Sequence, residues 1–139
     1  MARKTKSRGI AMFVLVASLV AGCATSGTVK QVTAADAPML AGTWQGNLYP
    51  ASGGGQTATL TVNRDGTYTT QAGAFSSTGK LEIKDGNVHF VSTGGTGVFG
   101  SGDRAGSATL LDRGGNWGLV GNGYGSRGGP FNFEFNKGK

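Results

Sequence analysis

The chain has 139 residues, of which 27 are glycine, so it is long enough for one small domain and rich in a residue that interrupts regular structure. The formal net charge is +6, but four of the thirteen Lys and Arg residues precede residue 23, which leaves nine basic against seven acidic residues after it. These remaining cations are scattered, whereas nucleic-acid binding requires clustered cations that neutralise phosphates, so the composition excludes a nucleic-acid partner.

The first 23 residues have the layout of a secretory signal, with a basic start followed by apolar or small residues from Ile10 to Val20. This apolar run is too short to span a bilayer, which needs about 20 residues. It ends in Val20-Ala21-Gly22-Cys23, which resembles the lipobox of bacterial lipoproteins. In that family the chain is cut before the cysteine, so the resemblance implies a signal peptide over residues 1–22 and lipid attachment at Cys23.

Cys23 is the only cysteine of the chain, so no intramolecular disulfide can form. The alternative interpretation, an ordinary secreted protein, would leave a free thiol in an oxidising compartment. In the lipoprotein family the acyl chains attach the protein stably to a membrane. An aspartate after the cysteine commonly retains Gram-negative lipoproteins at the inner membrane, so Ala24 implies an outer-membrane protein that faces the periplasm, if the cell is Gram-negative.

Residues 23–38 are predicted to form a flexible tether between the lipid and the domain. Small and polar residues dominate this stretch, hydrophobic periodicity is absent, and Asp36 is its only acid. The reach of such a chain is roughly 20–25 Å, which is enough to hold a small domain clear of the lipid headgroups.

From residue 39 to residue 139 the sequence predicts an all-β domain. Phe131, Phe133 and Phe135 alternate with polar residues, and the segment 57–62 alternates in the same way. A period of two with one polar face is typical of antiparallel sheet. Eight strands are predicted, over residues 41–49, 56–63, 67–72, 78–84, 87–92, 107–112, 117–122 and 131–136.

A hairpin at Asp85-Gly86 fixes the register of the fourth and fifth predicted strands, because these residues suit a two-residue type I′ turn. The turn pairs Leu81 with Phe90 and Glu82 with His89, so the large apolar side chains share one face. On the other face a cross-strand charge pair contributes roughly 0.2–1 kcal/mol. We therefore interpret His89, the single histidine, as structural.

The turn between the second and third predicted strands favours a three-residue loop, Arg64–Gly66. This loop pairs Val62 with Tyr68, whereas a two-residue loop would place Tyr68 across from Asn63. A slip of one residue moves every side chain to the opposite face, so burial favours the longer loop.

Eight sequential strands with short connections predict a small antiparallel up-and-down β-barrel, since closure removes exposed edges. A transmembrane barrel is the rival architecture, but it needs apolar outward faces and strands of about 9–11 residues. Here the outward faces carry Glu82, Lys84 and Glu134 and the predicted strands are shorter. These features favour a soluble barrel on a lipid anchor.

Gly42-Thr43-Trp44 at the first strand is similar to the Gly-x-Trp signature of lipocalins and related calycin barrels. The architectural resemblance covers about residues 40–136. It implies that Trp44 closes one end of the barrel and that a basic residue near the last strand packs over it. Arg127 and Lys137 both have a suitable location, and the sequence does not choose between them.

The sequence offers no set of residues typical of an enzyme or a metal site. One histidine and dispersed acids form neither a catalytic triad nor an ordinary zinc site. The segment 123–128 matches the pattern G-x-G-x-x-G, but that motif needs a helix directly after it, and here Gly129-Pro130 leads into a strand. We therefore expect a protein without catalytic activity or cofactor.

Two glycine-rich loops, Thr93–Gly106 and Gly121–Pro130, are the candidate binding segments of the barrel. Each carries an aromatic and a basic residue: Phe99, Arg104, Tyr124 and Arg127. Loops at a barrel mouth commonly hold a ligand or partner, although they also serve as plain connectors.

These observations favour a non-catalytic, membrane-anchored lipoprotein of the cell envelope whose barrel binds a small apolar ligand. The alternative is a protein-interaction or structural module of the envelope. The two differ in the barrel interior, because a carrier needs space that its own side chains leave empty.

Overall fold

The computed structural model describes residues 27–95, 102–125 and 129–139, with side chains from residue 106 onward in the second of these segments. In this part of the chain the elements follow the order β1 (Thr28–Lys30), η1 (Ala34–Asp36), α1 (Ala37–Leu40), β2 (Gly42–Pro50), β3 (Gln56–Val62), β4 (Thr67–Ala72), β5 (Phe75–Lys84), β6 (Asn87–Gly95), β7 (Gly102–Asp112), β8 (Asn116–Tyr124) and β9 (Pro130–Gly138). No helix within these segments is long and apolar enough to cross a membrane.

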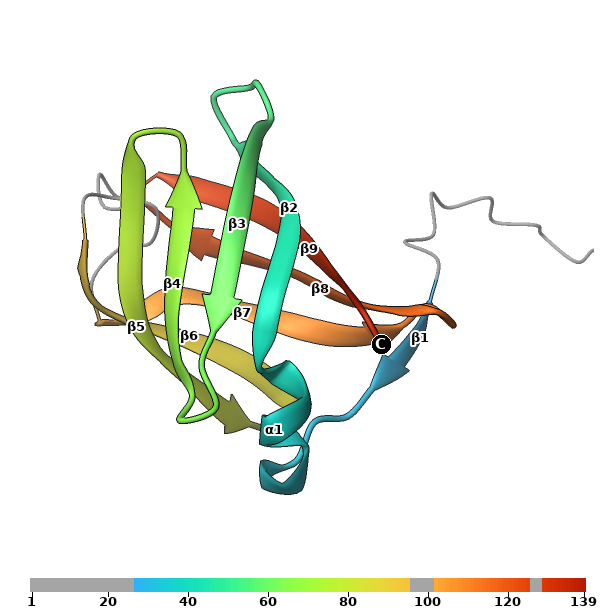
Figure 1. Ribbon diagram of the computed structural model, residues 1–139. Helices are drawn as coiled ribbons and strands as arrows, with labels where there is room; N and C mark the ends of the chain where they lie inside the picture. Colours follow the sequence, from blue (N-terminus) through green and yellow to red (C-terminus); the bar gives the residue numbers. More distant parts are fainter. Residues whose placement is uncertain (1–26, 96–101, 126–128) are drawn as a thin grey trace, which may run out of the picture.

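Strands β2 to β9 form a closed antiparallel barrel, with α1 at one end (Figure 1). Each strand pairs with the next in sequence, and β9 pairs back with β2. The eight strands correspond to those predicted from the alternation of apolar and polar residues. The prediction of an all-β, up-and-down barrel is therefore confirmed.

Both hairpin registers follow the sequence prediction. Asp85 and Gly86 have φ values of 53° and 77°, as a type I′ turn requires, and the flanking strands pair in the predicted register. Gly66 has a φ of 83°, and Val62 pairs with Tyr68 across the three-residue loop. Burial of the apolar faces therefore identified the register correctly at both turns.

The segment predicted to be a flexible tether is in part packed on the barrel. β1 pairs with the end of β7. The backbone N–H of Val32, which follows β1, donates a hydrogen bond of 2.9 Å to the carbonyl of Gly86 in the β5–β6 hairpin. The side chain of Val32 is buried in the core. The structure thus differs from the prediction over residues 28–38, because partners distant in sequence stabilise strand pairing that a three-residue segment does not form alone.

The hydrophobic core lies inside the barrel and beneath α1. Inward side chains from all eight barrel strands contribute to it, and Leu40 of α1 closes it at one end. The largest fully buried hydrophobic side chains are Trp44, Tyr68, Phe90, Phe133, Phe135, Leu60, Leu110, Leu119 and Val88. Aromatic rings therefore supply much of the buried apolar surface.

Candidate functional site

One end of the barrel is closed around Trp44, the inward residue near the start of β2. The indole is fully buried, and its Nε1 donates a hydrogen bond of 2.9 Å to the carbonyl of Leu40 in α1. Lys137 of β9 lies over the ring, with Nζ 4.9 Å from the ring centre. Of the two basic residues that the lipocalin resemblance left open, Lys137 occupies this place, whereas Arg127 lies outside the described residues.

Lys137 also ties α1 to the last strand. Its Nζ donates a hydrogen bond of 2.7 Å to the carbonyl of Ala41 and another to the carbonyl of Met39. Desolvation lowers the pKa of Lys137 from its ordinary value. A cation held on an aromatic face by two carbonyls therefore seals this end of the barrel.

A chain of aromatic rings crosses the interior of the barrel. Tyr68 of β4 meets Phe90 of β6 edge to face, with ring centres 5.2 Å apart. Phe90 meets Phe133 of β9 in the same manner at 5.4 Å, and Phe133 contacts Phe135 at 5.7 Å. Because β4, β6 and β9 lie at different positions around the barrel, these rings span its interior at this level.

Gly79 of β5, which pairs with Tyr68, leaves space for the ring of this tyrosine. A Cβ added at Gly79 would lie 2.8 Å from both Cε1 and the phenol oxygen of Tyr68, which is too close for a real contact. Burial raises the pKa of the Tyr68 phenol, and a hydrogen bond with Ser92 acts in the opposite direction. The glycine is therefore the position over which the tyrosine ring packs.

Other inward positions of β3 to β6 carry smaller side chains. These include Ala58, Ala72, Thr70, Ser77 and Ser92, all of them buried. The Thr70 hydroxyl is buried and has no hydrogen-bond partner among the described residues.

The candidate binding loops are shorter than predicted. β6 continues to Gly95 and β7 begins at Gly102, while β8 continues to Tyr124 and β9 begins at Pro130. The predicted loop bounds of 93–106 and 121–130 are therefore wrong. Neighbouring strands of the barrel pair with these glycine-rich segments, and this pairing overrides the low strand propensity of glycine.

The sequence-predicted binding residues are only partly placed by the structure. Tyr124 is the last residue of β8 and is 52% exposed, so it belongs to a strand end rather than to a loop. Arg104 lies within β7, also not in a loop. Phe99, Arg127 and the lipid-attachment residue Cys23 lie outside the described residues. The predicted binding site at the barrel mouth therefore stays a prediction.

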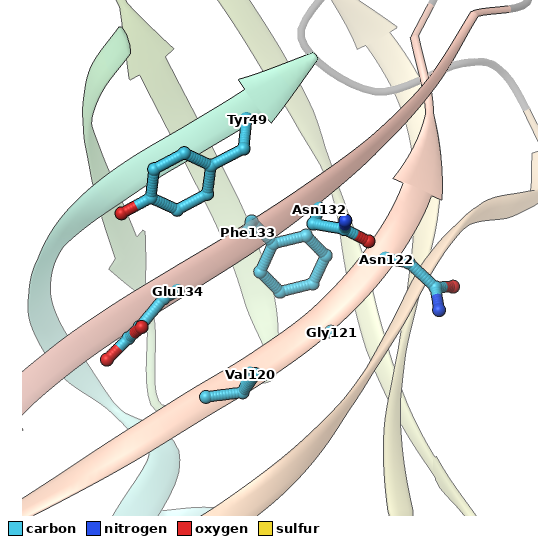
Figure 2. A pocket seen from close by; sticks show the side chains of 7 residues that line it. All are labelled: Tyr49, Val120, Gly121, Asn122, Asn132, Phe133 and Glu134. Carbon is cyan, nitrogen blue, oxygen red and sulfur yellow. The ribbon is translucent and has the colours of Figure 1, made fainter. Parts of the chain in front are cut away.

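A groove of about 420 Å³ lies on the outer face of the barrel, across β2, β9 and β8 (Figure 2). We call it the outer groove. Its lining residues are Tyr49, Val120, Gly121, Asn122, Asn132, Phe133 and Glu134. Tyr49 is 46% exposed, whereas the ring of Phe133 is buried inside the barrel. The groove is thus an external feature, separate from the interior.

Strand pairing places the polar groups of the outer groove side by side. Tyr49 pairs with Asn132, and Asn132 pairs with Asn122, so these residues form one row across three strands. Glu134 pairs with Val120 in the neighbouring row. The side chains of Asn122 and Asn132 form no hydrogen bond with another described residue.

The carboxylate of Glu134 is held by Arg113, which follows β7. One guanidinium nitrogen lies 2.6 Å from Glu134 Oε1 and donates a second hydrogen bond of 2.6 Å to Asn136. The arginine crosses β8 above Gly118, where an added Cβ would lie 2.9 Å from the guanidinium carbon. Only 12% of the Arg113 side chain is exposed, so its charge interacts with Glu134 and little with solvent.

Sequence reasoning missed the outer groove because its residues come from strands that only barrel closure brings together. The signal that exists is the row of polar residues between the phenylalanines of β9, including Asn132 and Glu134. Within the described segments, no group of three or more His, Cys, Asp or Glu side chains is arranged to hold a metal ion. Comparison with protein-family models, curated proteins and solved structures found no match to this chain.

Proposed function

We propose that this protein is a membrane-anchored lipoprotein of the cell envelope whose lipocalin-like barrel is a non-catalytic interaction module. The observation that carries the proposal is the chain of aromatic rings from Tyr68 through Phe90 to Phe133, which crosses the interior of the barrel and supports a packed core. An interior used for packing leaves the outer surface for recognition. The outer groove supplies a concave surface with unpaired polar side chains.

The position of β1 supports an orientation of this module on the membrane. β1 begins at Thr28, so only residues 24–27 separate it from Cys23, a span of roughly 15 Å at most. β1 pairs with the end of β7 on the side of the barrel that carries the closed end (Figure 1). A lipid on Cys23 therefore holds the closed end toward the membrane and leaves the outer groove on the side of the barrel.

Replacement of the lipid-attachment residue tests the anchor. Cys23→Ser removes the thiol that accepts the lipid, so the variant is expected to lose incorporation of labelled palmitate and to leave the washed membrane fraction. The unaltered chain should keep both properties, since two acyl chains give stable attachment. A variant that is still processed normally and stays in the membrane fraction would show that the lipoprotein assignment is wrong.

Site-specific photo-crosslinking in intact cells tests the interaction surface. A photoreactive amino acid at Asn132 in the outer groove should give an adduct of defined mass, and Tyr49→Ala in the same chain should abolish it. The same amino acid at Thr57, an exposed position on β3, is the matched control and should give none. Equal adducts from both positions, or none from Asn132, would contradict the proposed surface.

A carrier of a small apolar ligand is the second candidate function. It is favoured by the small buried side chains of Ala58, Ala72 and Ser77, which occupy less of the interior than aromatic rings would. A ligand would enter from the end opposite Trp44, because Trp44 and Lys137 close the other end. Binding of apolar compounds to the barrel decides between this candidate and the interaction module.

A further inference from the structure

We infer that the outer groove binds a neutral saccharide chain, an inference that rests on the proposed function because it names the partner of the same surface. The groove combines an exposed aromatic ring with side chains that both donate and accept hydrogen bonds. A sugar presents an apolar ring face and an array of hydroxyl groups that both donate and accept. The two sets of groups are complementary.

The row of Tyr49, Asn132 and Asn122 provides the polar groups that would form hydrogen bonds with a saccharide. Adjacent strands lie about 4.8 Å apart, so this row extends for roughly 10 Å across the sheet, which is long enough for two sugar rings. Each asparagine amide offers two donors and one acceptor oxygen. The side chains of both asparagines are free of hydrogen bonds to other described residues, so these groups are available to a ligand.

The ring of Tyr49 is packed on one side and exposed to a ligand on the other. On one side the ring lies against Gly55 of the β2–β3 connection, where an added Cβ would be 3.4 Å from Tyr49 Cε1. The side chain nevertheless remains 46% exposed. Figure 2 shows the ring on the side of the groove where Glu134 lies, with Asn132 and Asn122 on the other side. A preplaced aromatic ring reduces the entropy that is lost when a ligand binds.

The charge of the outer groove argues for a neutral ligand. Glu134 is the only residue of the lining that is charged at neutral pH, and Arg113 neutralises it at 2.6 Å. The arginine is itself largely buried and aimed at Glu134 and Asn136, so it offers no free cation to a phosphate or a carboxylate. An anionic polymer therefore lacks the ionic contacts that its binding requires.

The strand pairing argues against an extended peptide as the ligand. β2 pairs with β3 and β9, β9 with β2 and β8, and β8 with β7 and β9. Every strand beneath the groove thus has a partner on both edges, and no edge is open for the addition of a peptide strand. Hydrogen bonding in the groove therefore depends on side chains, as hydroxyl-rich ligands require.

Calorimetric titration of the full chain tests the inference. The protein is purified from membranes in a detergent without a sugar head group and titrated with chitotetraose and cellotetraose, two neutral tetrasaccharides. Saturable binding of at least one is expected, whereas a tetramer of galacturonic acid, which is anionic, should bind at least about tenfold more weakly, because the groove has no free cation.

Substitutions in the outer groove locate the binding. Tyr49→Ala and Asn132→Ala should each weaken saccharide binding about tenfold, since each removes a ring face or a set of hydrogen bonds. Tyr49→Phe retains the ring and should weaken binding less than about threefold. Phe75→Ala and Asn116→Ala change an exposed aromatic residue on β5 and an exposed asparagine at the start of β8, both outside the groove lining, and are the matched controls. Circular dichroism of each variant checks that the fold is retained.

The outcomes separate this inference from the proposed function. No saturable binding of either neutral tetrasaccharide, or binding that both Tyr49→Ala and Asn132→Ala leave unchanged, overturns the saccharide assignment. If the groove still forms a Tyr49-dependent photo-crosslink in cells, the proposed interaction module stands with a partner of another class. If the groove gives neither an adduct nor saccharide binding, both the inference and the proposed function fail.

Discussion

Lys137 of β9 and Lys139, which directly follows this strand, have different roles in the structure. Lys137 lies over Trp44 and binds two backbone carbonyls, and no carboxylate in the described segments pairs with it. Lys139 lies over Trp117 and pairs with Asp112 at 2.7 Å, with about a third of its side chain exposed. The first lysine joins two elements, whereas the second forms a surface ion pair.

Substitution of the two lysines by methionine should separate these roles. Lys137→Met keeps the apolar stem but loses the bonds to Met39 and Ala41, which should reduce the free energy of unfolding by about 2 kcal/mol. Lys139→Met, the matched control, should reduce it by less than about 1 kcal/mol, because exposed ion pairs contribute little. Urea denaturation of the two variants measures the difference, and equal losses would contradict the role assigned to Lys137.

Three aspartates give the fold a dependence on acidic pH. Hydrogen bonds from the side chain and backbone of Thr67 hold the pKa of Asp65 below its ordinary value of 3.8. A backbone hydrogen bond from Thr33 lowers the pKa of Asp36, and Lys139 lowers that of Asp112. These contributions to stability are present above pH 3.8 and are lost as pH falls through the lower pKa of the folded state.

The urea midpoint of the barrel should therefore fall when the pH is lowered from 7 to below about 3. Asp65→Asn removes one of the three titrating groups and should make this decrease smaller. Its own midpoint at pH 7 should be lower than that of the unaltered chain. A midpoint that stays constant across this pH range would show that these hydrogen bonds do not favour the ionised carboxylates.

At the scale of elements, the β5–β6 hairpin combines a local turn signal with a contact distant in sequence. Gly86 has a φ of 77°, and the side chain of Gln31, next to β1, packs directly against it. The carbonyl of the same glycine accepts a hydrogen bond from Val32. The turn therefore fixes the register of two strands and also receives the N-terminal segment.

Gly86→Val should destabilise the barrel by more than about 1 kcal/mol, because a β-branched residue resists positive φ and would collide with Gln31. Gly115→Val is the matched control. Gly115 also lies in a hairpin turn, but it has no positive φ, and an added Cβ there would meet nothing within 4 Å. Denaturant melts compare the two variants, and an unchanged midpoint for Gly86→Val would mean that the turn is wrongly described.

The barrel strands could be predicted because their signals are local. Alternation such as Phe131, Phe133 and Phe135 identifies a strand and its buried face, and Asp85-Gly86 specifies its turn without distant partners. The three residues of β1 show no alternation, and their pairing with β7 depends on the finished barrel. For the same reason the glycine-rich ends of β6 and β7 were assigned to a loop, although they continue as strands.

At the scale of the whole molecule, the candidate site depends on contacts that no local pattern encodes. Tyr49 and Asn132 become neighbours only when β9 pairs back with β2 and closes the barrel. Arg113 reaches Glu134 only across β8, over Gly118. The sequence therefore predicts the barrel, and the lipocalin resemblance implies the basic residue over Trp44, which is Lys137. The outer groove is not predicted, and the binding residues at the mouth stay a prediction.

The central claim is that the aromatic rings fill the barrel, so that recognition occurs outside it. Thermal melts of the barrel with fatty acids, phospholipids and porphyrins test this claim most directly. A compound that binds only the folded state raises its stability by about 2.7 kcal/mol at a hundredfold excess over Kd, which shifts the melting temperature of a domain of this size by roughly 10 °C or more. Phe90→Ala, which removes the central ring, serves as the comparison.

The unaltered barrel should show no saturable shift with any of these compounds. Phe90→Ala should lose about 3–5 kcal/mol of stability, and benzene should restore part of it by occupying the cavity that the missing ring leaves. A saturable rise in the melting temperature of the unaltered barrel with an apolar compound would contradict the account and establish the carrier function in its place.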